Sequence, residues 1–440
     1  MTALSLRARD ADVIDTELAV IGAGMAGLAA ELFASNRGVA TLVIGGPSEL
    51  RYASGPFDLL AIHPTEQRKL WSDPFAGIEA LVHDHPLHPY ARLSRESIGA
   101  AFSELLLYLA QAGLPYERHV DRNCELVTSL GTVKHTYCVP RSMWPGVLCW
   151  QSKPECLFVA LRGMKDFSAR HIVAALADQW PAARALRISL PGAEDLTELS
   201  ADYAARCCDL PEIRARLAQA ILPELGTAKA VGLPAVLGFA RPTEAIADLE
   251  QRLGVPVFEI PIPPVSVPGL RLAAAFERQL RARGQAAMLL HNRVLEAKHD
   301  DDGSFLLEVG TTQARYAVRA KAVLLATGRF LGKGLEADRQ RIRETLFDLP
   351  VHQPASRAEW HRLDMLDPRG HPVSQAGLET DEHLRPLGAS GRAAFPTLFA
   401  AGSILAHQDW TRSKCGSGLA IATAYGAVSA YCQAKASGQV

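Results

Sequence analysis

The sequence lacks any pair of cysteines in a C-x-x-C arrangement, and its cysteines are scattered along the chain. Zinc ribbons, dithiol redox motifs and iron–sulfur clusters held by thiolates all need clustered cysteines. The sequence therefore predicts no metal site, and an organic cofactor would have to carry any electrons that the protein moves. The eight cysteines are Cys124, Cys138, Cys149, Cys156, Cys207, Cys208, Cys415 and Cys432.

The sequence also has neither an excess of one charge nor a long hydrophobic run. Lys and Arg number 46 against 47 Asp and Glu, so no positive field favours nucleic acid. The apolar stretches at 221–240 and 418–430 are interrupted by Pro234 or by charges, or fall short of the ~20 residues that a spanning helix needs. The polar residues 1–15 lack the apolar segment of a secretory signal. These absences predict a cytoplasmic protein that binds no nucleic acid and does not itself span a membrane.

A β-α-β unit is predicted near the N-terminus. Residues 16–21 form a short apolar run that ends at a glycine loop, and residues 25–37 are rich in helix-forming Ala, Leu and Glu. Residues 39–44 form a second apolar, β-branched run. Because such crossovers are right-handed, the two strands should be parallel neighbours.

The loop of this unit carries the dinucleotide fingerprint G-x-G-x-x-G, from Gly22 to Gly27. The first glycine permits a tight turn, the second lets backbone N–H groups approach a phosphate, and the third lets helix and strand pack closely. The start of the helix adds positive potential toward the anion. The cofactor-binding candidates here are Gly22, Gly24, Met25, Ala26 and Gly27.

One expected partner of a dinucleotide is missing. An acidic residue usually ends the second strand and holds the adenosine ribose. Here Ile44 is followed by Gly45, Gly46 and Pro47, and Glu49 comes slightly late. The gap favours the mononucleotide flavin FMN, with FAD and an unusual ribose contact as the alternative.

The remaining chain predicts an α/β protein in which a second α/β domain is inserted into a Rossmann-type flavin or dinucleotide domain. We expect the first domain at 1–79 and 266–440 and the inserted domain at 80–265. A helix at 270–283 precedes alternating runs at 293–298, 305–309 and 316–319, which indicate an antiparallel meander. The apolar run 322–326, ending at Thr327 and Gly328, is typical of a strand buried in a parallel sheet. A strand at 397–401 and a helix at about 418–433 complete the first domain.

Further glycine-containing loops are candidates for contact with a flavin ring. Ser54 and Gly55 lie just beyond the second strand, where small residues could pass close to a flat ring or could equally form a turn that leads into a helix. A basic, glycine-containing loop precedes the last helix, whose N-terminus would point N–H groups at an electron-rich ring edge. Arg412 and Lys414 could equally be solvated surface charges, and an isolated cysteine is more often inert than redox-active. The candidates in this loop and at its start are Gly402, Lys414, Cys415, Gly416, Ser417 and Gly418, and Thr327 and Gly328 after the run 322–326 are further candidates.

No catalytic acid or base is assigned. His407, Lys165 and Asp166 are weaker candidates, because a loop histidine could shuttle protons but most of the 14 histidines must be structural or exposed.

The chain resembles the B subunit of the anaerobic glycerol-3-phosphate dehydrogenase from about Glu17 to the last helix. The fingerprint alone is shared by many flavoproteins, but the motifs together are specific. They are 21–28, 54–60, His88-Pro89-Tyr90, Gly163-Met164-Lys165-Asp166-Phe167, Leu233-Pro234-Ala235, 263–269, 325–330, 380–386 and Cys415-Gly416-Ser417-Gly418.

The resemblance implies a membrane-associated complex of three subunits that oxidises glycerol 3-phosphate to dihydroxyacetone phosphate and passes electrons to quinone. It implies a catalytic, substrate-binding A subunit with its own FAD, a B subunit that uses FMN, and a C subunit with iron–sulfur clusters. The chain would then be cytoplasmic and held at the inner membrane through a partner. No arginine cluster suited to a phosphate monoester stands out, so glycerol 3-phosphate is not placed in this chain.

Three functions remain open on the sequence. The first is an electron-relay flavoprotein inside a larger dehydrogenase, favoured by flavin-facing glycine loops without an obvious acid and base. The second is a self-sufficient flavin dehydrogenase of another small molecule, with the inserted domain covering its substrate. The third is a scaffold that has kept the fold and lost the cofactor. The missing acidic residue at the ribose position suggests this function.

Overall fold

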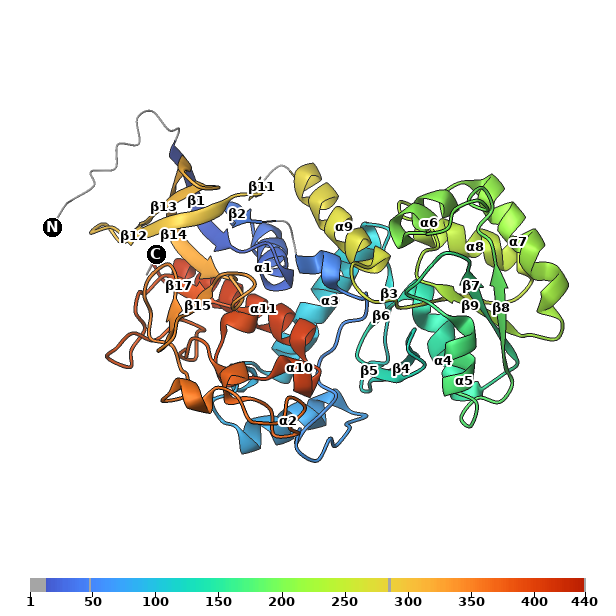
Figure 1. Ribbon diagram of the computed structural model, residues 1–440. Coiled ribbons are helices and arrows are strands. Elements are labelled where there is room, and N and C mark those ends of the chain that lie inside the picture. Colours follow the sequence, from blue (N-terminus) through green and yellow to red (C-terminus); the bar gives the residue numbers. More distant parts are fainter. Residues whose placement is uncertain (1–12, 47–48, 284–285, 439–440) are drawn as a thin grey trace.

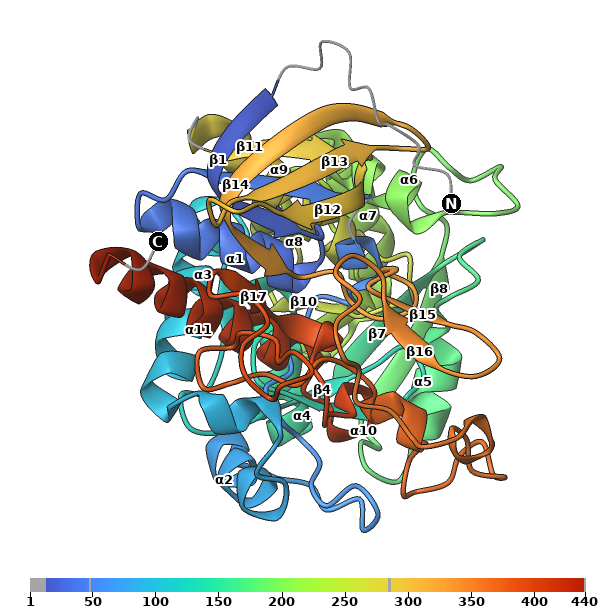
Figure 2. The ribbon, with the colours of Figure 1, turned by 90° about the vertical axis from the view of Figure 1, so that its left-hand side faces the viewer.

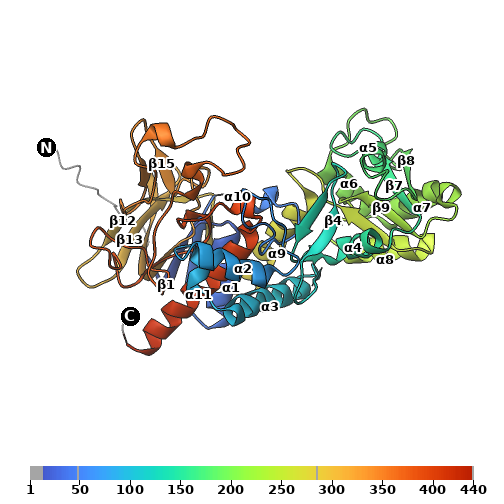
Figure 3. The ribbon, with the colours of Figure 1, turned by 90° about the horizontal axis from the view of Figure 1, so that it is seen from below.

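The computed structural model describes residues 13–46, 49–283 and 286–438, and these form two lobes that lie side by side (Figure 1). The larger lobe contains both ends of the described chain. The smaller lobe is formed by the middle of the chain (Figure 3). No helix among the described residues is both long and apolar enough to cross a membrane.

The β-α-β unit opens the larger lobe as predicted. Strand β1 (Val13–Ile21) leads through the glycine loop into helix α1 (Met25–Asn36), and β2 (Thr41–Gly45) returns parallel to β1. Every residue of β2 is buried, as expected for a strand inside a covered parallel sheet. The short strand β11 (Ala286–Leu290) pairs parallel with the other edge of β2.

A long strand joins the meander to the parallel sheet. Strands β12 (Arg293–His299), β13 (Phe305–Gly310) and β14 (Ala314–Leu325) form the predicted antiparallel meander. The runs predicted separately at 316–319 and 322–326 are one continuous strand, because β14 pairs with β13 at its start and with β1 along most of its length. Strand β17 (Leu398–Ala400) pairs with the end of β14, and the sheet order is β11-β2-β1-β14-β13-β12.

Helices cover this sheet and share one hydrophobic core. Helix α11 (Gly416–Ala436) packs against α1 and against α3 (Arg95–Gln111), which Figure 2 shows below the sheet. The buried side chains of α2 (Pro74–Asp84) and α3 belong to the same core cluster as those of α1. A division at residue 80 would cut through this cluster, and we therefore propose that the inserted unit begins after α3.

Between α3 and the smaller lobe lie short pairs of strands. Strand β3 (Tyr116–Glu117) pairs with β6 (Val139–Pro140), and β4 (Cys124–Val127) pairs with β5 (Val133–Thr136). The other short elements are β15 (Leu335–Ala337), β16 (Ile342–Glu344), α10 (Trp410–Ser413) and the 3₁₀ turns η1 (Glu49–Tyr52), η2 (Pro89–Arg92), η3 (Arg141–Met143), η4 (Arg357–Glu359), η5 (Pro372–Gln375) and η6 (Gly402–Ile404).

The smaller lobe has its own four-stranded parallel sheet in the order β10-β9-β7-β8. The strands are β7 (Cys156–Leu161), β8 (Ala183–Ile188), β9 (Ala230–Pro234) and β10 (Val257–Ile260). All residues of β7, β9 and β10 are buried, whereas β8 at the edge exposes half of its side chains. The helices are α4 (Trp144–Ser152), α5 (Ala169–Ala175), α6 (Ala201–Cys208), α7 (Pro211–Leu225) and α8 (Pro242–Leu253).

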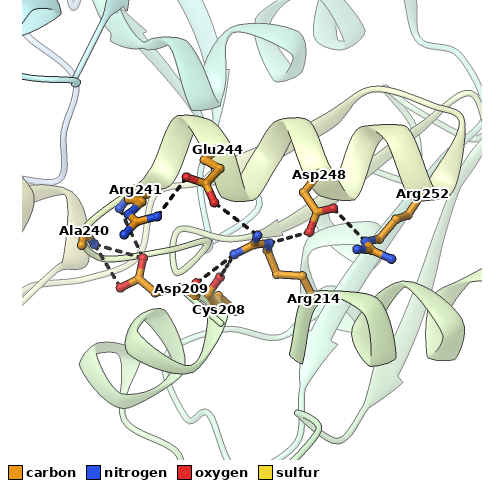
Figure 4. A network of polar contacts seen from close by, with 8 residues as sticks. All are labelled: Cys208, Asp209, Arg214, Ala240, Arg241, Glu244, Asp248 and Arg252. Carbon is orange, nitrogen blue, oxygen red and sulfur yellow. Dashed lines mark hydrogen bonds and ion pairs between the residues drawn. The ribbon is translucent and has the colours of Figure 1, made fainter. Parts of the chain in front are cut away.

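Buried Arg214 joins three helices of the smaller lobe (Figure 4). Its guanidinium on α7 donates to the carboxylate of Asp248 on α8 at 2.6 Å and to the carbonyl of Cys208 at the end of α6 at 3.1 Å. It also donates to the carbonyl of Asp209, whose carboxylate accepts from the backbone N–H of Ala240 just before α8. These contacts satisfy a charge that burial would otherwise make costly.

Helix α9 (Val267–Arg283) connects the two lobes, between which Figure 1 shows it. Its Arg271 is buried and donates to both carboxylate oxygens of Glu259, at 2.7 and 2.9 Å. Glu259 lies on β10, is fully buried, and accepts the backbone N–H of Leu237. This bidentate pair thereby holds the start of α9 against the sheet of the smaller lobe.

We expect Arg271→Met to lower the free energy of unfolding by about 3–5 kcal/mol, because it leaves the buried Glu259 carboxylate without its counter-charge. Urea unfolding followed by circular dichroism measures this. The double variant Glu259→Gln with Arg271→Met should recover part of the loss, and Arg278→Met, at an exposed position of the same helix, should change little. Equal effects of the changes at 271 and 278 would contradict this role of the ion pair.

Candidate functional site

Two of the three fingerprint glycines are required by backbone packing. Gly22 has a φ of +118°, and a Cβ there would lie 2.2 Å from the carbonyl oxygen of Ala326. A Cβ on Gly27 would lie 1.8 Å from the carbonyl oxygen of Gly22. Both distances are far shorter than any van der Waals contact. These two glycines therefore let β1, α1 and the end of β14 meet backbone to backbone.

The middle glycine has a different environment. Gly24 is the N-cap residue of α1, and no side chain caps this helix end. A Cβ built on Gly24 would meet no atom within 4 Å. The space beside Gly24 is therefore open and no side chain caps the start of α1, as an anion site at a helix N-terminus requires.

Thr327 and Gly328 follow β14 beside this loop. Thr327 is buried, and a Cβ on Gly334 would lie 2.3 Å from its Oγ1, so the hydroxyl is directed toward Gly334. That hydroxyl has no hydrogen-bond partner among the described residues. Gly328 has a φ of +67° and turns the chain back. The structure thus places both residues next to the fingerprint, with the Thr327 side chain turned into its own loop.

Gly402 follows the end of β17 and contacts both α1 and α11. Its φ is +79°, and a Cβ there would lie 2.7 Å from the Cβ of Ala26. Its backbone N–H donates to Oγ1 of Thr423 on α11 at 2.9 Å. The start of α1 and the loop before the last helix are therefore neighbours, although they lie at opposite ends of the sequence.

The segment 54–60 is attached to the start of α11. The backbone N–H of Asp58 donates to Oγ of Ser417 at 2.6 Å, and the N–H of Gly418 donates to the carbonyl of Asp58, also at 2.6 Å. A Cβ on Gly418 would lie 2.7 Å from the Cα of Leu59. The structure thus brings together segment 54–60 and the start of α11, which the sequence predicted as two separate candidates.

Two residues that the sequence analysis missed fix the Asp58 side chain. Its carboxylate accepts from Nζ of Lys134 and from Oγ1 of Thr136, each at 2.7 Å. Both residues lie on β5, far along the chain from Asp58, and no sequence motif marked them. Next to Asp58, the ring of Phe57 stacks on Tyr116 at 4.6 Å, and the Tyr116 hydroxyl donates to the carbonyl of Gly55, which lies beside half-buried Ser54.

The N-terminus of α11 has no side-chain cap either. Cys415 is its N-cap residue and is fully buried, and burial raises the pKa of its thiol well above the ordinary value. The thiol therefore stays protonated and unreactive at neutral pH. Gly416 packs against Trp410, while Lys414 is exposed with a φ of +52°.

Arg329 is a further residue that sequence reasoning missed. It follows Gly328, and its guanidinium donates to the carbonyls of Ser403 at 2.8 Å and Gln408 at 2.9 Å, and also to that of Ser374. Burial lowers its pKa to about 10, so the charge persists at neutral pH. Arg329 lies within the motif 325–330, but its carbonyl partners are far away in sequence, so no local pattern predicts these hydrogen bonds. It holds the loop after β17 in place.

The weaker candidates do not meet at one place. Lys165 is exposed in the smaller lobe and pairs with Glu198 at 2.9 Å, and Asp166 beside it is also exposed. His407 contacts Glu379 at 2.6 Å in the larger lobe. Arg412, half-buried, lies 3.5 Å from the carboxylate of Asp409. None of these contacts identifies a catalytic acid or base.

A known protein family and several known proteins are similar to this chain over most of its length. A family model described as an FAD binding domain matches residues 17–419. A protein of Halobacterium salinarum, named as the probable B subunit of an anaerobic glycerol-3-phosphate dehydrogenase, is 32% identical over 433 residues, covering 96% of this chain and 99% of the relative. The B subunit of the anaerobic glycerol-3-phosphate dehydrogenase of Yersinia pestis is 30% identical, and the similarity covers 93% of this chain and 96% of the relative.

A third relative and one solved structure extend the comparison. The protein of the same name from Vibrio vulnificus is 27% identical, covering 94% of this chain and 96% of the relative. The crystal structure of a 3-ketosteroid-Δ4-(5α)-dehydrogenase from Rhodococcus jostii covers 97% of this chain and 98% of its own, at 13% identity and a TM-score of 0.38.

Proposed function

Because this chain belongs to the FAD-binding family of anaerobic glycerol-3-phosphate dehydrogenase B subunits, we propose that it relays electrons on a bound FAD inside a multi-subunit glycerol-3-phosphate dehydrogenase. The chain is a flavin-dependent oxidoreductase. The relay, its direction and the flavin contacts of individual residues are the proposal. Electrons would come from a catalytic A subunit that carries its own FAD and leave to an iron–sulfur C subunit, which serves the quinone pool.

Two helices that begin without a capping side chain carry the proposal. Helices α2, α3, α5, α6 and α10 begin with a side-chain cap, and α4, α7 and α8 begin with a proline in the first turn. Helices α1 and α11 have neither device. They pack against each other, and Gly402 contacts both. The uncapped start of α1 suits the anionic centre of a ligand. At the start of α11 the N–H of Gly418 already donates to the carbonyl of Asp58, so an electron-rich ring would face the residues before Gly418.

The residues fit such a ligand in distinct roles. The backbone amides of Met25, Ala26 and Gly27 would bind its phosphate groups, and the empty side-chain position at Gly24 would let them approach. The N-terminus of α11 would hold the ring, with its partial positive charge at one edge. A bound flavin would supply electron or hydride transfer at that ring. The Asp58–Ser417 contacts would keep segment 54–60 against the ring side of the site.

The identity of the flavin is proposed on the family match. The missing acidic residue after Ile44 favoured FMN, whereas the matched model is that of an FAD-binding domain and covers most of the chain. FMN as first choice has no support from this match. Glu49, the acidic residue that comes slightly late for the ribose contact, has a side chain outside the part of the protein that the structure describes.

Association with partners follows from the name of the relatives. A protein named as one subunit of an enzyme assembles with other subunits, and we propose the same for this chain. Attachment to the inner membrane would then take place through a partner, from the cytoplasmic side.

Acid release of the cofactor from the purified full chain, followed by chromatography, should yield FAD at about one molecule per chain. Release of FMN alone would contradict the choice of FAD. A colourless protein that takes up neither flavin on reconstitution would favour the scaffold function.

Gly24→Val should abolish flavin retention and leave the fold intact, because the new side chain would occupy the space of the phosphate without meeting protein atoms. Flavin absorbance per chain and the unfolding midpoint measure the two effects. Gly99→Val is a matched control, since Gly99 on α3 is equally open but remote in sequence from the glycine loops. A folded Gly24→Val protein with unchanged flavin content would refute the site.

The isolated chain should be yellow yet nearly inactive on glycerol 3-phosphate, because a relay protein lacks the substrate site. Reduction of the bound flavin, followed by its absorbance under anaerobic conditions, measures this. Rapid reduction by glycerol 3-phosphate, or by another small molecule without any partner chain, would replace the relay with a self-sufficient dehydrogenase.

A further inference from the structure

Three side chains with metal-binding atoms meet in the larger lobe. They are His352, Glu379 and His407, and one nitrogen or carboxylate oxygen from each lies within 4.8 Å of the others. The Nε2 of His407 lies 2.6 Å from Oε1 of Glu379, and the Nδ1 of His352 lies 3.9 Å from the same oxygen. Because the three come from separate segments of the chain, no local spacing in the sequence marked them.

Backbone hydrogen bonds hold the three chain segments side by side. His352 and Gly377 exchange two backbone hydrogen bonds, at 2.8 and 3.1 Å. Leu378 donates to Ile404 at 2.8 Å and accepts from Ala406 at 2.9 Å. Each of the three side chains is thus on, or next to, a residue fixed by this small ladder. Such backbone support is what holds a metal site close to its working geometry.

The backbone at His407 is held in an unusual conformation. Its φ is +60°, in the left-handed region that non-glycine residues seldom adopt, and its N–H donates to the carbonyl of Gln375 at 3.0 Å. Such conformations cost on the order of 1–3 kcal/mol and cluster at functional sites. Here the conformation aims the imidazole at Glu379.

A simple ion pair does not account for the second imidazole. Glu379 and His407 form a hydrogen-bonded pair that needs no third group. The centroid of the His352 ring nevertheless lies 4.1 Å from that of the His407 ring. Two charged imidazoles at this distance would repel each other. Coordination to one cation uses the neutral form of both rings, so a shared metal ion would bring the two imidazoles together without this repulsion.

We propose that His352, Glu379 and His407 form a binding site for a divalent transition metal ion, and that zinc is its preferred occupant. Two imidazole nitrogens and one carboxylate oxygen are a donor set that zinc accepts, with water as the fourth ligand. Ligands at about 2.0–2.2 Å from zinc lie roughly 3–4 Å apart. The three side chains therefore need only small rotations to coordinate the ion.

Solvent can supply the fourth ligand from two sides. His352 lines a cavity of about 710 Å³, and Glu379 and His407 line a smaller one of about 90 Å³. The side chains of His352 and Glu379 are 39% and 45% exposed, whereas that of His407 is 16% exposed. The ion would thus be reachable in the folded protein, with an open coordination position.

The test is a calorimetric titration of the full chain, free of affinity tags and pretreated with a chelator, with Zn²⁺. Binding of one ion per chain is expected. Cobalt as a second probe should give the visible bands of tetrahedral coordination, at wavelengths beyond the flavin absorption. Glu379→Gln, His352→Gln and His407→Asn should each weaken zinc binding by at least the roughly 10-fold that loss of even an outer-shell partner causes. Asn is chosen at 407 because it tolerates positive φ.

His361→Gln is the matched control. His361 lines the same larger cavity but is not one of the three ligands, so its removal should leave zinc affinity unchanged. Circular dichroism and the unfolding midpoint verify that each variant is folded. Failure of the folded wild-type chain to bind zinc would overturn the proposal, and so would equal affinity in the wild type and all three ligand variants. Flavin content is measured separately, so this outcome is independent of the proposed relay function.

Discussion

The close approach of three backbone segments around Gly22 is the constraint on which the candidate site depends. Strand β1, helix α1 and the end of β14 meet at distances that exclude even a Cβ at Gly22 or Gly27. The parallel strands therefore end side by side, and α1 starts from the loop that follows β1. In open parallel sheets, this carboxyl edge is where ligands bind. Only Gly24 faces open space, so tight packing at two glycines positions the amides that the third leaves accessible.

The rest of the site comes from residues that are distant along the chain. Gly402 contacts both α1 and α11, Arg329 holds the carbonyls that follow β17, and Asp58 is bonded to Ser417. Asp58 is also held by Lys134 and Thr136, which come from the short strands beside the smaller lobe. Segment 54–60 thus connects the start of α11 to the region between the lobes, and the position of the smaller lobe should influence the ring side of the site.

Sequence patterns predicted the elements whose signals are local. The apolar runs around the G-x-G-x-x-G loop predicted β1, α1 and β2, and the alternating runs at 293–298 and 305–309 indicated the meander. The continuity of β14 was missed because its middle alternates in exposure while its end is wholly buried. Arg329, Lys134 and Glu259 were missed for another reason: each has its role through partners that fold next to it, and no residue pattern encodes such a meeting. The roles of the glycine-loop residues toward a flavin remain predictions.

FMN was expected because no acidic residue follows β2, where such a residue usually binds the adenosine ribose of a dinucleotide. The structure weakens this inference. A Cβ at Gly45, where β2 ends, would lie 2.6 Å from the backbone nitrogen of Ala23. No side chain of any kind fits there, so the glycine is explained by the packing of the fingerprint loop alone. A Cβ at Gly46 would meet nothing within 4 Å, which makes position 46 the first after the strand that has room for one. The absence of an acidic residue at position 45 therefore reports on backbone packing and not on the size of the nucleotide.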